Sequence, residues 1–393
     1  MQYAATGCWT FLHNPKKAGI YSPHFYTLLT RILIRVKEKK QSMTIVENAI
    51  SLLKKLIATP SLSREEDQTA QIIADFLIDK NVPIHRERNN VWSINRHYST
   101  EKPNILLNSH HDTVKPNAGW QRNPFEPILE GDLLFGLGSN DAGGPLVSLI
   151  ATFLHFYHQE HLPYNLIIAA TAEEEISGPN GIASILPQLG HIDLGIIGEP
   201  TQMHVAAAER GLMVIDCIAH GKSGHAARNE GVNAIYEAIE DINWFRTFEF
   251  EKVSDFLGPV KMSVTQIEAG TQHNVVPDQC KFVVDVRVND CYSNQEVYEV
   301  INEATRCEVK PRSFRLNSSQ IALDHPIIVK AKAMGREIYG SPTLSDQALI
   351  PYTTVKIGPG DSARSHTADE YIGLSEIEEG VKLYIELLEG LEV

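Results

Sequence analysis

Histidines and acidic residues stand at the ends of four short apolar runs in this sequence. The runs cover residues 105–108, 166–170, 194–197 and 354–357, and the polar residues that follow them include His110, Asp112, Glu173, Glu174, Glu175, Glu199 and His366. A further acid, Asp141, follows a glycine-rich turn and precedes an apolar stretch. Imidazole and carboxylate groups are common ligands of zinc-type ions, so this pattern indicates a metal site.

Each of these residues has an ordinary structural explanation when it is taken alone. Asp141 could cap the helix expected after it, and the three consecutive glutamates could form a solvated turn. His110 and His366 could be hydrogen-bonded loop histidines, and Glu199 could be a simple loop residue. Their joint occurrence after separate runs favours one shared site, because unrelated loops would not gather ligands in this way.

The number and type of these groups suit a pair of ions. Two neutral imidazoles and three carboxylates nearly balance two divalent charges, and a carboxylate shared between the ions would hold them about 3.5–4 Å apart. Such a pair activates water for hydrolysis. The sequence therefore predicts a hydrolase with two divalent ions, zinc in the first place and cobalt as the alternative.

Strand-length and helix-length segments alternate along the chain and must position these groups. This alternation predicts an α/β fold with a mostly parallel sheet and helices on both faces. In such open sheets, ligands bind beyond the carboxyl ends of the strands. We expect helices over residues 45–57 and 145–157, and another that ends near residue 80 and begins with a capping box formed by Ser63 and Glu66.

A second region, residues 205–315, has a different pattern. It contains β-rich stretches at residues 213–219, 260–267 and 281–288, with a helix predicted over residues 233–245. We interpret it as a smaller α+β domain inserted into the larger one. The larger, catalytic domain then comprises residues 43–204 and 316–393, which agrees with the two domains expected for 393 residues.

Composition excludes several classes of function. The net charge of −14 argues against nucleic acid or an anionic membrane surface as a partner. The five cysteines show no CxxC spacing, which argues against a thiolate metal site and favours a reducing, cytoplasmic location. The sequence also lacks an apolar run of the roughly 18 residues that a membrane span needs.

Residues 1–42 carry seven Lys or Arg and one acid, a net charge of +6. A targeting peptide would need an uninterrupted apolar segment, but Arg31 and Arg35 divide the one near residues 28–36. We therefore interpret residues 1–42 as a non-native or disordered extension, with the natural start at Met43.

Taken together, the motifs resemble the acetylornithine deacetylase, succinyl-diaminopimelate desuccinylase and zinc carboxypeptidase family, nearest to its acetylornithine deacetylase-like members. The resemblance runs from about residue 45 to the C-terminus, with five motifs in the family's order. It implies that the first ion is held by His110 and Glu199, the second by Glu175 and His366, and that Asp141 bridges both.

The same resemblance assigns the residues that would act on the substrate. Glu174 would be the general base, which places Glu173 at the family's variable acidic position, and Asp112 would orient His110. The family's Gly-His turn matches His225, which would reach the active site of a partner subunit in a homodimer. Positions that match substrate-binding residues of the family are Asn274, Arg287 and Gly360.

Some positions depart from the family pattern. Ser109 stands where a glycine is frequent, and Leu137 and Gly143 replace an arginine and a lysine of the motif around Asp141. None of these changes removes a predicted ligand. The family varies at the position of Ser345-Asp346-Gln347, which we expect to shape the pocket.

The resemblance implies a cytoplasmic enzyme that removes the acyl group of an N2-acyl amino acid, with N-acetylornithine of arginine synthesis as the leading small-molecule substrate. Succinyl or citrulline analogues are close variants. A dipeptidase or carboxypeptidase with the same metal core, and a non-catalytic metal-binding relative, remain alternatives. A serine or cysteine hydrolase has little support, because Ser362 near His366 lacks the Gly-x-Ser-x-Gly turn.

Overall fold

The computed structural model describes residues 45–228 and 230–393, and the predicted extension at residues 1–42 lies outside this part of the chain. A nine-stranded mixed sheet carries the first domain, in the order β1-β2-β6-β3-β7-β17-β8-β15, with β16 also paired to β8. Its strands are β1 (His85–Glu87), β2 (Asn90–Ile94), β3 (Asn104–His110), β6 (Asn165–Thr171), β7 (Leu194–Ile197), β8 (Val205–Glu209), β15 (Ser319–Gln320), β16 (Ile338–Ser341) and β17 (Thr354–Lys356).

The centre of this sheet is parallel. Strands β6, β3, β7 and β17 are consecutive neighbours and run in one direction, whereas β2 and β8 join them antiparallel. These four central strands are the ones that the sequence predicts from its apolar runs, and their carboxyl ends lie at the same edge. The predicted fold class, a mostly parallel sheet with helices, is therefore confirmed.

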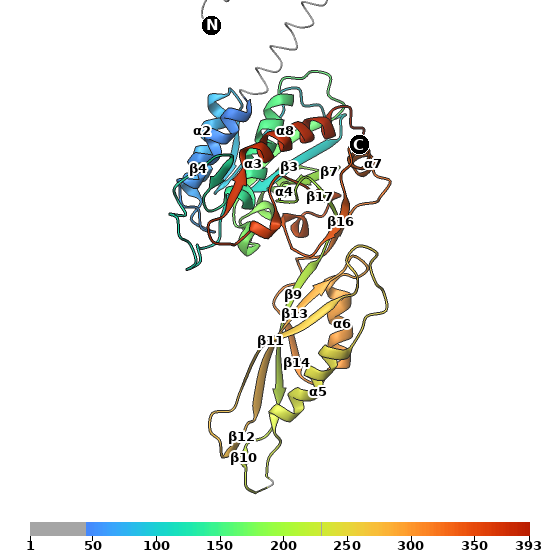
Figure 1. Cartoon of the computed structure of the whole chain (residues 1–393). Helices are drawn as coiled ribbons and strands as arrows, with labels where there is room; N and C mark the ends of the chain where they lie inside the picture. The colour runs from blue at the N-terminus through green and yellow to red at the C-terminus, as the bar shows by residue number, and fades with distance from the viewer. Residues whose placement is uncertain (1–44, 229) are drawn as a thin grey trace, which may run out of the picture. The chain divides into compact units, whose positions relative to one another are not determined.

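Helices cover both faces of the sheet. Leu106 and Ile167 pack with α4 on one face, and the alternation of side chains along a strand turns Ile105 and Leu107 to the other face. There α3 contacts β3 and β6 and packs against α8 (Figure 1). The helices are α2 (Asp67–Asp79), α3 (Gly144–Phe156), α4 (Ile182–Leu189), α7 (Pro326–Ala333) and α8 (Leu374–Leu388), with a helix at residues 45–57.

The predicted capping box at the start of α2 is wrong. The helix begins after Glu66, whose side chain makes no capping bond. Instead, the Ser63 hydroxyl donates a hydrogen bond to Asp112 at 2.7 Å, and a Glu66 oxygen accepts one from the backbone N–H of Glu173 at 3.2 Å. Both side chains are directed toward the loops that follow β3 and β6, where buried acceptors and donors need partners.

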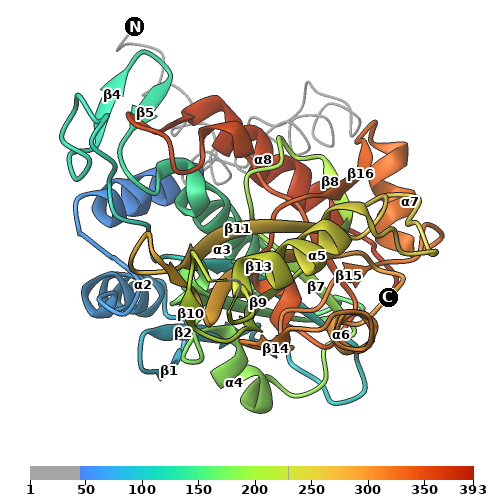
Figure 2. The ribbon, with the colours of Figure 1, turned by 90° about the horizontal axis from the view of Figure 1, so that it is seen from below.

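A second sheet is fully antiparallel, in the order β11-β13-β9-β14, and α5 lies across three of its strands (Figure 2). It has a core of its own, in which the alternating inward residues of β9 and β13 pack against α5 and α6. The elements are β9 (Gly211–His220), β11 (Lys261–Ala269), β13 (Gln279–Val288), β14 (Glu308–Pro311), α5 (Ala234–Thr247) and α6 (Asn294–Ala304).

Two small sheets complete the regular structure of the described residues. The ribbon of β10 (Gly224–His225) and β12 (Val275–Val276) extends from the region of the second sheet. A three-stranded sheet contains β4 (Ile128–Glu130), β5 (Leu133–Phe135) and β18 (Tyr371–Gly373). No helix among the described residues is long and apolar enough to cross a membrane.

Candidate metal centre

The five predicted ligands come together at the carboxyl edge of the parallel strands. His110 is the last residue of β3, and Glu199 follows β7. Glu175 lies in a short 3-10 turn after β6, and His366 follows a similar turn after β17. Asp141 lies in an irregular turn, Ser139–Gly143, that leads directly into α3.

Asp141 stands between the two histidines. Its Oδ1 lies 3.3 Å from Nε2 of His110, and its Oδ2 lies 3.7 Å from Nε2 of His366. The outer ligands complete each half of the cluster, since Glu199 is 3.8 Å from His110 and Glu175 is 2.9 Å from His366. One carboxylate with an oxygen toward each imidazole is the arrangement that a bridging ligand of two ions requires.

The donor set fits divalent cations. Ligand atoms of His110, Asp141 and Glu175 lie within 4.8 Å of one another, and so do those of His110, Glu174 and Glu199. Four carboxylates packed this closely at a largely buried site would repel one another unless positive charge were added. Two ions of charge +2 supply that charge, and oxygen and imidazole ligands without thiolates suit zinc-type ions.

Asp112 ties the first histidine to the glutamate turn. Its backbone oxygen accepts the Nδ1–H of His110 at 3.0 Å, which directs Nε2 toward the cluster. Its carboxylate accepts the backbone N–H groups of Glu174 and Glu175 at 3.0 and 3.2 Å. Asp112 therefore lies where the resemblance expects an orienting residue, and it also fixes the turn that carries two other site residues.

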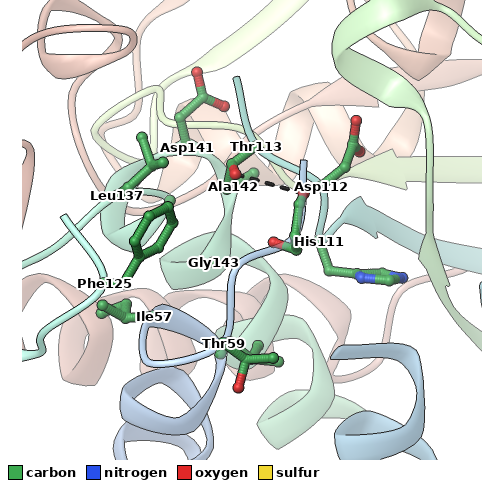
Figure 3. Close-up of a pocket in the computed structure, with 13 residues that line it drawn as sticks. Ile57, Thr59, His111, Asp112, Thr113, Phe125, Leu137, Asp141, Ala142 and Gly143 are labelled. Atoms are coloured by element: carbon green, nitrogen blue, oxygen red, sulfur yellow. Dashed lines mark hydrogen bonds between the residues drawn. The ribbon is translucent and has the colours of Figure 1, made fainter. Parts of the chain in front are cut away.

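Figure 3 shows the residues behind the cluster, where the carboxylates of Asp112 and Asp141 point away from the apolar side chains of Ile57, Phe125 and Leu137. The cavity on this side is about 20 Å³, room for little more than one water molecule. The cavity on the open side of the cluster is about 440 Å³, which suits a small ligand.

His111 and Glu173, which lie next to the cluster residues in sequence, hydrogen-bond to groups outside the cluster. Both ring nitrogens of His111 lie 2.9 Å from polar groups outside the cluster, the Thr69 hydroxyl and the Asn89 carbonyl. Burial lowers the pKa of His111 to about 4, so the ring is neutral. The Glu173 carboxylate accepts two hydrogen bonds from Asn180. Of the three consecutive glutamates, the second and third thus face the cluster.

Charge coupling inside the cluster shifts its proton affinities. Burial raises the pKa of Glu174 well above its ordinary value, and the neighbouring carboxylates add to the shift against the opposing effect of His110. Burial likewise raises the pKa of Glu199 to about 8. The hydrogen bond with Glu175 raises the pKa of His366 to about 9. Without ions, the cluster therefore retains protons that ions would have to displace.

The remaining predicted residues lie outside this cavity. His225, in β10, is exposed, and its Nδ1 accepts the backbone N–H of Ala227 at 3.2 Å. The backbone oxygen of Asn274 accepts the N–H of Ala226 in the same ribbon. Arg287 is paired with Asp285 on β13 at 2.8 Å.

Gly360 lies beside the cluster rather than in the ribbon. It has a φ of +90°, and a Cβ built on it would lie 2.5 Å from the Asn140 side-chain oxygen. A glycine is therefore required in this turn. The segment Ser345-Asp346-Gln347 does not line the cavity, whereas the preceding residues 341–344 form part of its wall. Asp346 instead accepts hydrogen bonds from Asn108 and Thr171 beneath the site, both at 2.8 Å.

Sequence reasoning missed an ion pair of Lys356, which lines the cavity, with Glu209 behind it. Lys356 and Glu209 are 3% and 1% exposed and lie 2.7 Å apart. The lysine ends a strand that the sequence shows as an apolar run, and Glu209 ends β8, more than 140 residues earlier. Only the pairing of β8 with β17 brings them together. Local sequence pattern carries no signal for such a pair.

Comparison with known proteins places the chain in a family. The sequence profile of peptidase family M20/M25/M40 matches residues 106–390. The chain belongs to this family. The expected resemblance to acetylornithine deacetylases and succinyl-diaminopimelate desuccinylases is thereby confirmed, and the protein is a metal-dependent hydrolase of amide bonds.

Several curated relatives are similar to most of the chain. An M20 domain-containing protein of Schizosaccharomyces pombe is 26% identical and covers 95% of this chain and 92% of its own length. A succinyl-diaminopimelate desuccinylase of Psychromonas ingrahamii is 25% identical, covering 87% and 98%. An acetylornithine deacetylase of Proteus mirabilis is 26% identical, covering 87% and 96%.

Solved structures share the fold. Aminopeptidase PepT of Bacillus cereus has a TM-score of 0.71 at 18% identity and covers 88% of this chain and 98% of its own. A Bacillus subtilis protein described as a dinuclear metal-binding peptidase of the family has a TM-score of 0.68 at 18% identity, with the same coverage.

The raised pKa values predict how the metal-free protein responds to pH. The folded state holds protons on His366 up to about pH 9 and on Glu199 up to about pH 8, whereas unfolded His and Glu release them near 6.5 and 4.5. Unfolding therefore releases protons in this range, and raising the pH favours unfolding. We expect the melting temperature of the chelator-treated protein to fall between pH 6.5 and 9. A melting temperature that rises over this range would contradict the raised pKa values of His366 and Glu199.

Replacing His366 by Ala tests the ligand set. The variant should lose one of two bound ions, because the second position would retain only Glu175 and Asp141. Metal content of the dialysed protein measures this. His191→Ala is a matched control, since His191 is an exposed histidine 3.5 Å from a carboxylate, that of Asp193. Unchanged metal content in His366→Ala would remove His366 from the site.

Proposed function

We propose that this protein is a two-zinc deacylase that hydrolyses the amide of an N2-acyl amino acid, with N-acetylornithine as the leading substrate. The observation that carries the proposal is Asp141, whose two oxygens face His110 and His366 with Glu174 beside them. Relatives named acetylornithine deacetylase and succinyl-diaminopimelate desuccinylase support the substrate class. The cavity of about 440 Å³ supports a small substrate.

The ions, when bound, would polarise the acyl carbonyl and lower the pKa of a water molecule toward 7. Glu174 lies 3.8 Å from His110, faces the cavity and has a raised pKa, so it is suited to take the proton of the attacking water. It would then give this proton to the leaving amine. Asp112 holds the backbone of Glu174 during both transfers.

Glu174→Gln separates this role from metal binding. A positioned base contributes about 10²–10⁴-fold to turnover, so kcat should fall by that factor while metal content stays unchanged. Glu173→Gln is the matched control, because that carboxylate contacts Asn180 instead of the cluster, and it should keep most of the activity. Full activity of Glu174→Gln would show that another group is the base.

A substrate panel tests the proposed reaction. The zinc-loaded protein should hydrolyse at least one of N-acetylornithine, N-acetylcitrulline and their N-succinyl analogues in preference to dipeptides. Preferred cleavage of dipeptides would instead indicate a dipeptidase with the same core. Failure on every amide in the panel would favour a non-catalytic metal-binding protein.

We also propose that the second sheet and its helices, which span residues 211–311, form the interface of a homodimer in which His225 of one subunit serves the site of its partner. The predicted boundary at residue 205 is six residues too early, because β8 (Val205–Glu209) belongs to the first sheet. Strand β11 is an edge strand of the second sheet and has an exposed Ile267. Helix α5 on the same sheet exposes Tyr236 and Ile239, which are 68% and 51% accessible. Apolar groups exposed beside an open sheet edge favour association.

Mixing two inactive variants tests this arrangement. In a dimer of one Glu174→Gln and one His225→Ala subunit, one site would combine an intact Glu174 with the partner's His225. Random mixing should therefore recover about a quarter of wild-type activity. Subunits that remain monomeric by analytical ultracentrifugation, or mixtures with no recovery, would contradict the shared site.

A further inference from the structure

Glu370 holds the turn that carries Asp141. Its Oε1 accepts the backbone N–H groups of Asn140 and Asp141 at 2.8 and 2.9 Å, and its Oε2 accepts that of Gly138 at 3.1 Å. The side chain is buried, with 2% of its surface accessible. One carboxylate thus accepts three of the four backbone N–H groups of residues 138–141.

The fold determines this placement. Strand β18 pairs antiparallel with β5, with Tyr371 opposite Phe135. Glu370 immediately precedes β18, and its backbone oxygen accepts the N–H of Gly136 at 3.0 Å, which continues the pairing by one step. The Glu370 side chain is thereby set against the turn that leaves β5, where backbone N–H groups would otherwise lie buried and unpaired.

The hydrogen bonds of Glu370 bear on both proposed ion positions, because they hold the residue that lies between them. Asp141 is the group whose two oxygens face the two histidines, and its backbone N–H is one of the three that Glu370 binds. Glu370 is also four residues beyond His366, so one short segment supplies an outer ligand and fixes the central one.

We propose that Glu370 is a positioning residue that sets the Asp141 carboxylate between the two ions. The inference rests on the proposed two-metal site. A carboxylate is suited to this task because both of its oxygens are acceptors. In a glutamine, one of the two would be an NH₂ group facing a backbone N–H, and at least one of the three bonds would be lost.

The test is a Zn²⁺ titration of the metal-free full-length chain against a chromophoric chelator, for wild type and Glu370→Gln. Loss of an outer partner of a ligand typically weakens metal affinity by about 10–100-fold. We expect a loss of this size for both ions, because Asp141 serves both positions. Glu370→Asp keeps the charge but sets it back by one methylene group, so it should weaken both zinc affinities by a smaller factor. It serves as the test if Glu370→Gln does not fold.

A matched control is available in the adjacent residue. Asp369 also accepts two backbone N–H groups, those of Gln121 and Arg122, but they belong to a surface loop. Asp369→Asn should leave both zinc affinities within about twofold of wild type, because an outer partner tunes only the ligands it contacts.

Four outcomes would overturn the inference. Unchanged zinc affinities in Glu370→Gln and Glu370→Asp would show that Glu370 has only a structural role. Weakening of a single ion would mean that the effect passes through His366 in the same segment. Equal losses in Asp369→Asn would point to a general disturbance of residues 366–370. If wild-type protein itself failed to bind two ions, the proposed function would fail first and this inference with it.

Discussion

The concentration of negative charge at one sheet edge is the constraint on which this structure depends. Four carboxylates and the His110 imidazole meet where little water can solvate them, and the more exposed His366 borders them on one side. Burying like charges together is costly unless each is hydrogen-bonded or offset by cations. Behind the cluster, two further buried carboxylates are satisfied by backbone N–H groups, and they fix the turns that carry the cluster residues. Asp112 binds those of the glutamate turn, and Glu370 binds those of the Asp141 turn.

The parallel sheet makes such a concentration feasible. Its neighbouring strands all end at the same edge, so ligands separated by more than 250 residues reach one point without long flexible segments. His110 ends a strand of this sheet, and Glu175, Glu199 and His366 follow other strands of it, whereas Asp141 lies in a turn that leads into α3. The rigidity that a two-ion site needs therefore comes from the sheet, and the turns contribute the side-chain directions.

The sequence was sufficient to predict the central strands, the fold class and the group of residues at the cluster, because apolar runs of strand length ended in metal-binding residue types. It failed where a side chain acts far from its own element. Ser63 and Glu66 had the spacing of a helix cap, yet their partners are Asp112 and the backbone of Glu173. Long-range pairs such as Glu209 with Lys356 depend on strand order, which no local pattern encodes.

The glycine at position 143 limits how far the family can guide changes to this chain. The motif that the sequence resembles has a lysine at this position, but a Cβ at Gly143 would lie 2.4 Å from the Gly138 carbonyl oxygen, which accepts the N–H of the same residue. The loop around Asp141 has therefore closed more tightly than a side chain at this position allows. Consensus engineering that restored the lysine would have to reshape the loop, and it would disturb the metal centre without touching a ligand.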